Sequence, residues 1–403
     1  MQRDPIPSVP AEDVAAQTEH YAAQARVLAP RIATGADAIE RTRRIPDDLL
    51  DALHAAGFYR MLIPRRYAGG EVHPLAFMRT LQAIARADAS VAWNIGQNAV
   101  CAIVAAYLEP EVARTIFGDP RAVLAWGPAQ GPVRAVACEG GYRVSGRWSF
   151  ASGMRQATWL GPQCPVFEGD GSPRRTGEAR MRRRVFLIPA TAARLEDVWD
   201  VIGLRGTASD AFSVDDLFVP EAYSVHRESP IENREPGWLY CFSIHNLFSC
   251  GFAAIALGVA QAMLAAFIEL ATHKVARGMR SALRENAVVQ AGVARTQATL
   301  ESAEAYLMHA VGEICDAVQS TRAVTIEQRM RIRLASTHAI HAAREAGSFA
   351  FEAAGATAVF AANPFERRFR DLHAIAQQLQ GRAAHFETVG QHLLGLEPDT
   401  SFL

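Results

Sequence analysis

The feature that most restricts the fold is a long uncharged stretch in the second half of the chain. From residue 241 to residue 268 the sequence contains no Asp, Glu, Lys or Arg. A helix of that length could cross a bilayer, so a membrane span is one interpretation. The stretch also contains His245, Asn246, Ser249 and Gln261, together with many alanines and glycines that permit close helix packing. We therefore expect a buried helix of a helical bundle, and no membrane association.

The first part of the chain has the periodicity of helices. Within DDLLDALHAAGFYRMLIP, the residues Leu49, Leu50 and Leu53 recur at helical spacing before the chain turns near Gly57 and Pro64. A second helical run begins after the turn and continues to about residue 117. This pattern predicts an N-terminal helical domain over residues 1–118.

The pattern then changes to short apolar runs separated by turns. AVLAWG, RRVFLIP and AFSVDDLFVP are typical of antiparallel strands. Gly140 and Gly141 can adopt the positive φ of a tight turn, which predicts a hairpin within RAVACEGGYRVSG. We expect a central antiparallel β-barrel or sandwich over residues 119–228. The polar, basic segment 168–184 is interpreted as a solvated strand connection, with contact to a phosphate or a partner as the alternative.

From residue 229 to residue 403 the chain is again rich in Ala and poor in Pro. The long run ENAVVQAGVARTQATLESAEAYLMHAVGEICDAVQ is typical of an up-down bundle, and we expect four helices. The predicted fold class is therefore mostly α with a β domain, in the order helical domain, β domain, helix bundle.

Bulk properties exclude several classes of function. The 41 basic and 42 acidic residues nearly cancel, which argues against a nucleic acid partner. The first residues have no apolar core of a signal peptide, so we expect a cytoplasmic protein. No two of the six cysteines have Cys-x-x-Cys spacing, and His338, His341 and Glu345 are interpreted as ordinary helix residues. We therefore expect no metal site.

Common catalytic motifs are missing from the sequence. It contains no Gly-x-Gly-x-x-Gly, no Gly-x-x-x-x-Gly-Lys-Ser/Thr and no Gly-x-Ser-x-Gly. The Glu-x-x-His pairs of di-iron bundles are missing as well. Rossmann dehydrogenases, P-loop enzymes, α/β-hydrolases and di-iron proteins are therefore all disfavoured.

Three segments, in this order, resemble the acyl-CoA dehydrogenase superfamily. They are GGYRVSGRWSFASG at 140–153, VIGLRGTASDAFSVDDLFVP at 201–220 and RRFRDLHAIAQQ at 367–378. The resemblance is closest to the branch of two-component flavin-dependent monooxygenases, which hydroxylate small aromatic or polycyclic compounds. It implies reduced FMN or FAD delivered by a separate flavin reductase, and dioxygen as cosubstrate. It also implies a flavin C4a-hydroperoxide, and a homotetramer with the flavin near a subunit boundary.

The resemblance also indicates which residues would contact the flavin. WSFASG would line the ring, since Trp148 and Phe150 offer aromatic faces, Ser152 a hydroxyl and Gly153 open backbone. By strand alternation Trp148 and Phe150 should share a face, so packing in the β core is the alternative for both. The remaining cofactor-binding candidates are Trp126 and Gly127 on a neighbouring strand, Arg277 and Gln290 for the phosphates, and Asp371 in the late helix.

The reaction class is predicted from missing carboxylates. A dehydrogenase needs a carboxylate base within reach of the substrate, and the resemblance implies that this base would follow the pair Arg370-Asp371 by about two turns or lie on the earlier bundle helix. No Asp or Glu follows Asp371 before Glu387, and residues 241–268 contain none. A monooxygenase is therefore favoured. A flavin dehydrogenase or oxidase with a base from elsewhere, and a non-catalytic member of the fold, stay open as alternatives.

His373 and Ser152 are the catalytic candidates, because histidine can protonate or orient a peroxide near neutral pH. A structural histidine that makes polar contacts is the alternative for His373. Relatives often have a histidine seven residues after the Asp, where this chain has Gln378. On an ideal helix positions 373 and 378 lie about 140° apart, so one side chain cannot simply replace the other. The predicted substrate contacts are Gly206, Thr207, His245 and Asn246; buried, internally satisfied polar groups are the alternative for His245 and Asn246.

Overall fold

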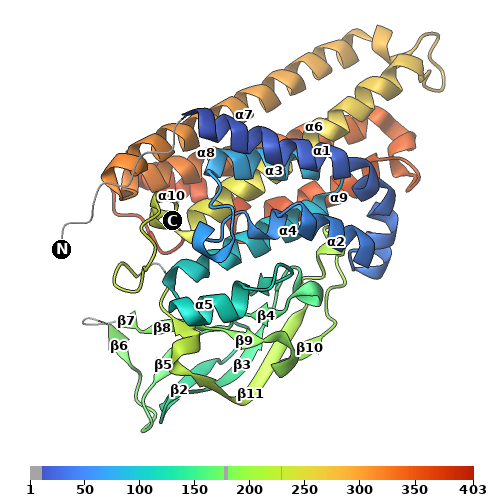
Figure 1. Cartoon of the computed structure of the whole chain (residues 1–403). Coiled ribbons are helices and arrows are strands. Elements are labelled where there is room, and N and C mark those ends of the chain that lie inside the picture. The colour runs from blue at the N-terminus through green and yellow to red at the C-terminus, as the bar shows by residue number, and fades with distance from the viewer. Residues whose placement is uncertain (1–10, 177–179, 228) are drawn as a thin grey trace.

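The computed structural model describes residues 11–176, 180–227 and 229–403. Along these residues the predicted order of helices, strands and helices is confirmed (Figure 1). Residues 1–10, 177–179 and 228 lie outside the described residues. The rest of the polar segment 168–184, expected to be a strand connection, includes the short strands Arg175–Thr176 and Arg180–Met181 and the start of Arg183–Phe186.

Five α-helices make up the first part: α1 (Ala11–Thr42), α2 (Asp47–Ala55), α3 (Pro74–Ala85), α4 (Ala89–Ala102) and α5 (Pro110–Phe117). The predicted apolar face of α2 is confirmed, because Leu49, Leu50 and Leu53 are all buried. Asp88 begins α4 by accepting a 2.8 Å hydrogen bond from the Val91 amide, which satisfies one of the free N–H groups of the first turn.

The β domain consists of one large curled sheet and two smaller sheets. Seven strands follow the order β10-β11-β3-β2-β5-β8-β12: β10 (Arg194–Glu196), β11 (Ala211–Pro220), β3 (Gly141–Trp148), β2 (Arg134–Cys138), β5 (Gln163–Phe167), β8 (Arg183–Phe186) and β12 (Ser224–Val225). Three short strands, β1 (Leu124–Ala125), β4 (Trp159–Leu160) and β9 (Ile188–Pro189), form a second sheet, and β6 (Arg175–Thr176) pairs with β7 (Arg180–Met181). The predicted hairpin joins β2 to β3, with Gly140 at φ 75°.

The last part is helical: α6 (Ile244–His273), α7 (Ala287–Thr321), α8 (Ile326–Ala354), α9 (Phe365–Gln377) and α10 (Ala384–Leu393). The uncharged stretch is most of α6, which packs against α3, α4, α7, α8 and α9. Within the described residues, two helical segments are long and apolar enough to span a membrane, α6 and Ala89–Tyr107. Most of the residues in both apolar segments are buried inside the protein. The expectation of a buried bundle helix is therefore confirmed for α6.

The two helical parts share one hydrophobic core. Side chains of α1 to α5 and of α6 to α9 form one continuous buried cluster, whereas the β domain has a separate cluster around Trp148 and Phe212. In Figure 1 the β domain lies beneath the helices, with α4 and α5 nearest to it. The site described below lies where these two cores meet.

Candidate functional site at the junction of α4, α6 and the β domain

The segment that follows β3 places neighbouring side chains on opposite sides. β3 ends at Trp148, and Phe150 has a φ of 56°, a left-handed conformation that breaks strand alternation. Trp148 is fully buried, stacks on Phe212 and donates its indole N–H to Gln163 O at 3.1 Å. Phe150 is 56% exposed, with its ring against Trp199. The prediction that Trp148 and Phe150 share a face is therefore wrong; Trp148 is a core residue, and Phe150 faces outward.

Ser152 begins a buried chain of three hydroxyl groups. Its Oγ accepts the indole N–H of Trp93 at 3.1 Å and lies 2.6 Å from Ser209 Oγ. Ser209 Oγ lies 2.7 Å from Thr207 Oγ1, and Thr207 Oγ1 donates to Leu204 O at 2.8 Å. Each of the three hydroxyls can both donate and accept, so the chain can orient or move a proton. The structure thus brings together Ser152 and Thr207, which were predicted separately.

α4 holds this segment in place through two asparagines. Asn98 donates to Leu124 O at 3.1 Å and to Ser152 O at 3.0 Å, while Asn94 donates to Gly206 O at 3.4 Å. Both side chains are 1% exposed, and the Oδ1 atom of each is buried without a hydrogen-bond partner in the described structure. Gly153 allows this contact, since a Cβ there would lie 2.3 Å from Asn98 Oδ1.

An aromatic stack extends from Ser152 along α6. The rings of Trp93 and Phe252 are parallel within 5°, with centroids 3.8 Å apart, and Phe248 stacks on Phe252 at 5.5 Å. Phe248 and Phe252 are one helical turn apart on the same face of α6. Flat apolar ligands are typically bound by such surfaces, and the hydroxyl chain adds polar groups at one end.

Trp126 and Gly127 also border this region. Gln97 of α4 donates to Trp126 O at 3.5 Å, and the guanidinium of Arg227 lies 5.3 Å from the centroid of the Trp126 ring. The Gly127 backbone packs directly on the turn after β3, because a Cβ there would lie 1.8 Å from Ser149 O. Ser149 Oγ is itself buried without a partner in the described structure.

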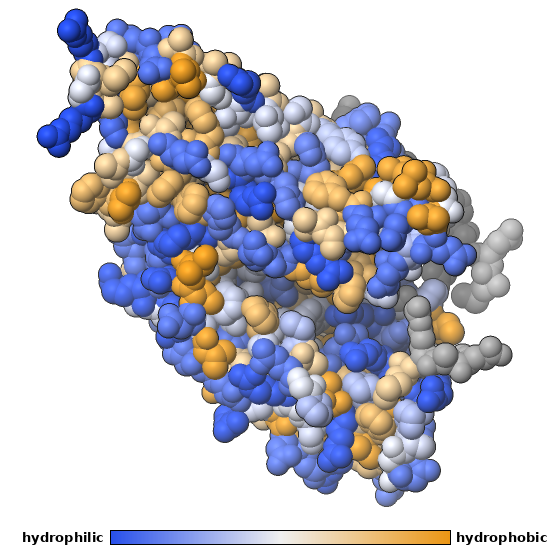
Figure 2. All heavy atoms as spheres, turned by 180° about the vertical axis from the view of Figure 1, so that it is seen from behind, coloured by the Kyte–Doolittle hydropathy of each residue, from blue (hydrophilic) through white to orange (hydrophobic). Residues whose placement is uncertain are grey.

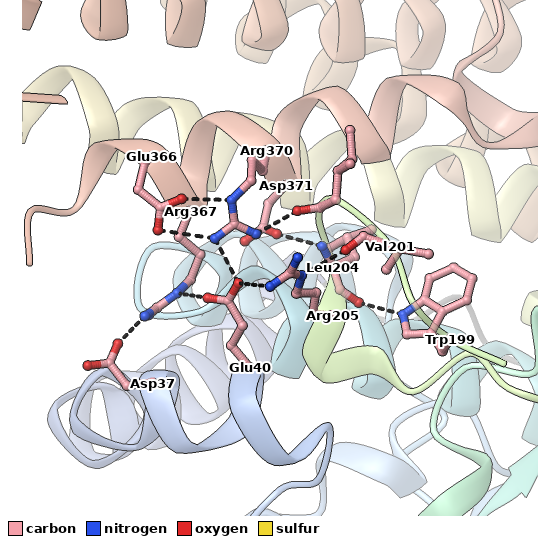
Figure 3. Close-up of polar contacts among 11 residues, drawn as sticks. Asp37, Glu40, Trp199, Val201, Leu204, Arg205, Glu366, Arg367, Arg370 and Asp371 are labelled. Carbon is pink, nitrogen blue, oxygen red and sulfur yellow. Dashed lines mark hydrogen bonds and ion pairs between the residues drawn. The ribbon is translucent and has the colours of Figure 1, made fainter. Parts of the chain in front are cut away.

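Asp371 positions the loop that carries Thr207 and Ser209 (Figure 3). Its Oδ1 accepts the Leu204 amide at 2.6 Å, and the side chain is 3% exposed. The neighbouring Arg370 donates to Ile202 O at 2.5 Å. Gly203 allows this approach, because a Cβ there would lie 2.2 Å from Arg370 O. Asp371, predicted to bind the cofactor, is thus placed so that it holds the loop.

The outer side of the same loop borders an open cavity of about 1140 Å³ between α1 and α9. Glu40 is its central anion: it contacts Arg367 at 2.6 Å, Arg370 at 2.7 Å and Arg205 at 3.7 Å (Figure 3). Burial raises the pKa of Glu40, but Arg367 and Arg370 outweigh this effect and hold the pKa below its usual range. The lining charges neutralise one another, so we interpret this network as a structural link between α1, α9 and the loop.

Asp371 and Asp88 form a pair of buried acids behind the site. Burial raises the pKa of Asp371 to about 7, and the nearby charge of Asp88 adds to this; burial likewise raises the pKa of Asp88 to about 6. The folded protein therefore holds the Asp371 proton more tightly than the unfolded chain does. Stability from this group is complete at low pH and is lost as the pH rises toward 7.

Asp371→Asn is expected to make unfolding less dependent on pH. Asn keeps an oxygen for the Leu204 amide but no charge, so the variant should gain stability relative to the parent between pH 5 and pH 7. The gain is at most about 1.4 kcal/mol per pH unit. Urea unfolding at several pH values measures it, and Asp215→Asn on the exposed side of β11 is the control. Parallel pH profiles for parent and Asp371→Asn would contradict this account.

The structure places His373 and Gln378 differently from the ideal helix. His373 packs on Phe369, 4.3 Å between ring centroids, and burial and Arg344 of α8 lower its pKa. It is two residues from Asp371, so it points to the opposite side of α9. α9 ends at Gln377, and Gln378 has an extended backbone; the angle of 140° therefore does not apply. The structure does not bring His373 to the Ser152 chain.

The remaining candidates are spread over α6 and α7. Asn246 is buried and completes the capping box of α6 with Ser243, so the helix itself uses the side-chain oxygen and the backbone N–H of Asn246. Arg277 and Gln290 are exposed near the α6–α7 connection, at the end of the bundle distant from the β domain in Figure 1. Within one chain they do not meet Ser152.

Several residues of the site were missed from the sequence. Trp93, Asn94 and Asn98 lie in an apolar helix with no family motif, and Ser209 is one of many serines. The spacing of 94 and 98 by four residues was a usable signal, because it puts two amides on one face of a buried helix.

Comparison with known proteins agrees with this architecture. Residues 15–117 match the acyl-CoA dehydrogenase N-terminal domain, and residues 250–380 match the acyl-CoA dehydrogenase C-terminal domain. Indole-3-acetate monooxygenase of Pseudomonas putida is 28% identical over 90% of this chain and 91% of its own length. The pigment production hydroxylase of Rhodococcus erythropolis is 30% identical over 83% of this chain and 86% of its own.

Solved structures share the fold over nearly the whole chain. XiaF from Streptomyces sp., in complex with FADH2 and glycerol, has a TM-score of 0.89 at 23% identity and covers 97% of this chain and 99% of its own. The 3-HSA hydroxylase from Rhodococcus sp. RHA1 has a TM-score of 0.85 at 26% identity, covering 94% and 98%. This chain therefore belongs to the acyl-CoA dehydrogenase family, within its branch of flavin-dependent monooxygenases.

Proposed function

We propose that the protein is the oxygenase component of a two-component monooxygenase. It takes reduced FMN or FAD from a separate flavin reductase, uses dioxygen and hydroxylates a small aromatic or polycyclic substrate. The observation that carries this proposal is the turn after α9, where a dehydrogenase would need a carboxylate base. Gln378 occupies this turn, and its Nε2 is a buried donor without a partner in the described structure. Such a group can donate a hydrogen bond but cannot remove a proton.

The chemistry of the side chains at the junction of α4, α6 and the β domain suits a flavin. The isoalloxazine ring is flat and apolar with a polar edge, and it would face Phe150, Trp126 and the backbone at Gly127 and Gly153. The buried, unpartnered Ser149 Oγ would gain a partner from that edge. When bound, the reduced flavin would supply the electrons that activate dioxygen.

The Ser152 chain would act on the reacting oxygen atoms. Ser152 has one hydroxyl hydrogen, which it donates to Ser209 when Thr207 donates to Leu204 O. When the three hydroxyls reverse their directions, Ser152 can donate that hydrogen to a reacting oxygen atom while it still accepts from Trp93. The Trp93, Phe252 and Phe248 rings would hold a flat substrate and exclude water, which favours hydroxylation over release of peroxide.

Arg277 and Gln290 would bind the flavin phosphate of a second copy of the chain. Both are exposed, at the α6–α7 connection and the start of α7. That end of the bundle lies away from the β domain in Figure 1, and in Figure 2, seen from behind, it projects with hydrophilic residues at its tip. Another subunit would therefore have to bring them to a flavin phosphate. The guanidinium fork of arginine suits a phosphate. We therefore propose a homotetramer with the flavin at a subunit boundary.

Isotope labelling tests the reaction class. The protein is supplied with reduced FMN or FAD, ¹⁸O₂ and a panel of indole-3-acetate, resorcinol and p-hydroxyphenylacetate, which are the substrates named for similar enzymes. One ¹⁸O atom in a hydroxylated product is expected, and oxidised flavin should not be bleached by an acyl-CoA under anaerobic conditions. Bleaching would support the dehydrogenase alternative, and failure to bind any reduced flavin would support the non-catalytic alternative.

A further inference from the structure

A buried guanidinium without a counter-charge lies at the N-terminal end of α6. Arg333 of α8 is 1% exposed, donates to Gln380 Oε1 at 2.5 Å and donates to Phe402 O. Its Nε is buried without a partner, and no carboxylate in the described part of the chain forms an ion pair with it. An unpaired charge in the interior is costly, so a site that retains one is suited to an anion.

Gln380 connects this charge to His245. Arginine can only donate, so Gln380 must turn its oxygen toward Arg333 and its NH₂ toward His245 Nδ1, which lies 3.3 Å away. Burial, with Arg227 and Arg333 nearby, lowers the pKa of His245 to about 3, and the ring is neutral. Because Nδ1 accepts, the proton is on Nε2, and His245 presents an N–H donor.

Gln378 adds a second donor at this end. The Oε1 atom of Gln378 accepts a 2.7 Å hydrogen bond from the backbone N–H of Gln380, which fixes the orientation of the Gln378 side-chain amide. The buried Nε2 of Gln378 then has no partner in the described structure. The groups that remain to be satisfied here are therefore hydrogen-bond donors beside a positive charge. An acceptor with a negative charge is complementary to them.

The distance to the hydroxyl chain suits one aromatic molecule. His245, Phe248 and Phe252 lie on one face of α6. Residue 252 is seven positions after residue 245, which corresponds to a rise of about 10 Å along the helix. Phe252 stacks on Trp93, which binds Ser152. The α6 face therefore has a donor-rich end, an aromatic middle and a hydroxyl end.

We infer that the substrate is an aromatic carboxylate, with its anionic group bound by His245 and Gln378 and its ring along the α6 aromatic stack. Arg333 acts through Gln380 and supplies the positive potential. This inference rests on the proposed function, because it assumes that oxidation takes place at the Ser152 end.

Anaerobic calorimetry with matched acids and amides tests the inference. The flavin-loaded protein is titrated with phenylacetate and phenylacetamide, and with indole-3-acetate and indole-3-acetamide. We expect the acid of at least one pair to bind tenfold or more tightly than its amide. His245→Phe should bring that ratio close to one, and Gln378→Glu, which adds a negative charge, should reverse it. His338→Phe replaces an exposed histidine of α8 and should leave the ratio unchanged.

Equal binding of acid and amide in both pairs would overturn the inference, and so would no binding of either pair. A folded His245→Phe protein that keeps the preference would also overturn it; if that variant does not fold, Gln378→Glu alone decides the outcome. No turnover occurs without dioxygen, so the titration does not depend on hydroxylation. Failure of the ¹⁸O experiment would remove the proposed function and leave the measured preference standing.

Discussion

Ser152→Ala is expected to lower the rate of substrate hydroxylation by roughly 10²-fold or more, which is the usual contribution of a group that donates or transfers a proton. The hydroxyl lies between Trp93 Nε1 and Ser209 Oγ, and alanine leaves both without this partner. Loss of the chain should also divert dioxygen to hydrogen peroxide. Product and peroxide are measured together, with reduced flavin supplied in excess and the substrates of the labelling experiment.

The stability of the Ser152→Ala protein should fall by about 1–3 kcal/mol, because two buried polar groups lose a partner. This loss is smaller than the unfolding free energy of most domains, so the variant should stay folded. Ser336→Ala is the matched control: Ser336 is equally buried, but its hydroxyl has no partner in the described structure. Ser336→Ala should change neither activity nor stability by much. Full coupled activity in Ser152→Ala would remove Ser152 from the reaction.

Trp148→Ala is expected to destabilise the protein by about 3–5 kcal/mol, as is usual when a buried aromatic side chain is truncated. Trp148 is fully buried in the β-domain cluster and stacks on Phe212 at 5.4 Å. The resulting cavity would lie in the strand that leads to Ser152, so activity should fall with stability. Thermal and urea unfolding measure the effect.

Trp148→Phe separates a core role from flavin contact. Phenylalanine keeps most of the buried area and the stacking but loses the hydrogen bond to Gln163 O. We expect a loss of about 1 kcal/mol in stability and no change in affinity for reduced flavin. Phe150→Ala should lower the affinity for reduced flavin and leave stability nearly unchanged, because Phe150 is exposed and contributes little to the core. A lower flavin affinity in Trp148→Phe, with stability intact, would return Trp148 to the cofactor site.

The sequence by itself determined the order of the structural layers. Helical periodicity, the absence of charge from residue 241 to residue 268 and the Gly140-Gly141 turn are local properties, and local sterics and burial act on them directly. The reaction class needed more than local properties, because the family resemblance supplied the two positions at which a missing carboxylate is informative. The three segments that resemble the acyl-CoA dehydrogenase superfamily supplied the predictions of the cofactor, the partner and the site residues.

The sequence prediction failed where a regular element ends. Strand alternation was carried from Trp148 to Phe150, but β3 stops at Trp148 and Phe150 adopts a positive φ. Helical spacing was carried from His373 to Gln378, but α9 stops at Gln377. In both places the backbone changes its period within one or two residues, because contacts from other elements determine where it turns. After β3, Asn98 donates to Ser152 O and the Ala151 amide donates to Asp210 O; after α9, Arg333 of α8 donates to Gln380 Oε1.

Only the tertiary structure decided which side chains form the site. Trp93 meets Ser152 across 59 residues, Ser152 meets Ser209 across 57, and His245 meets Gln380 across 135. None of these residue types is unusual for its segment, so no local pattern distinguishes them. They become a site because the helical and β-domain cores meet around them and remove water. A buried polar group must then find a partner inside the protein or in a ligand.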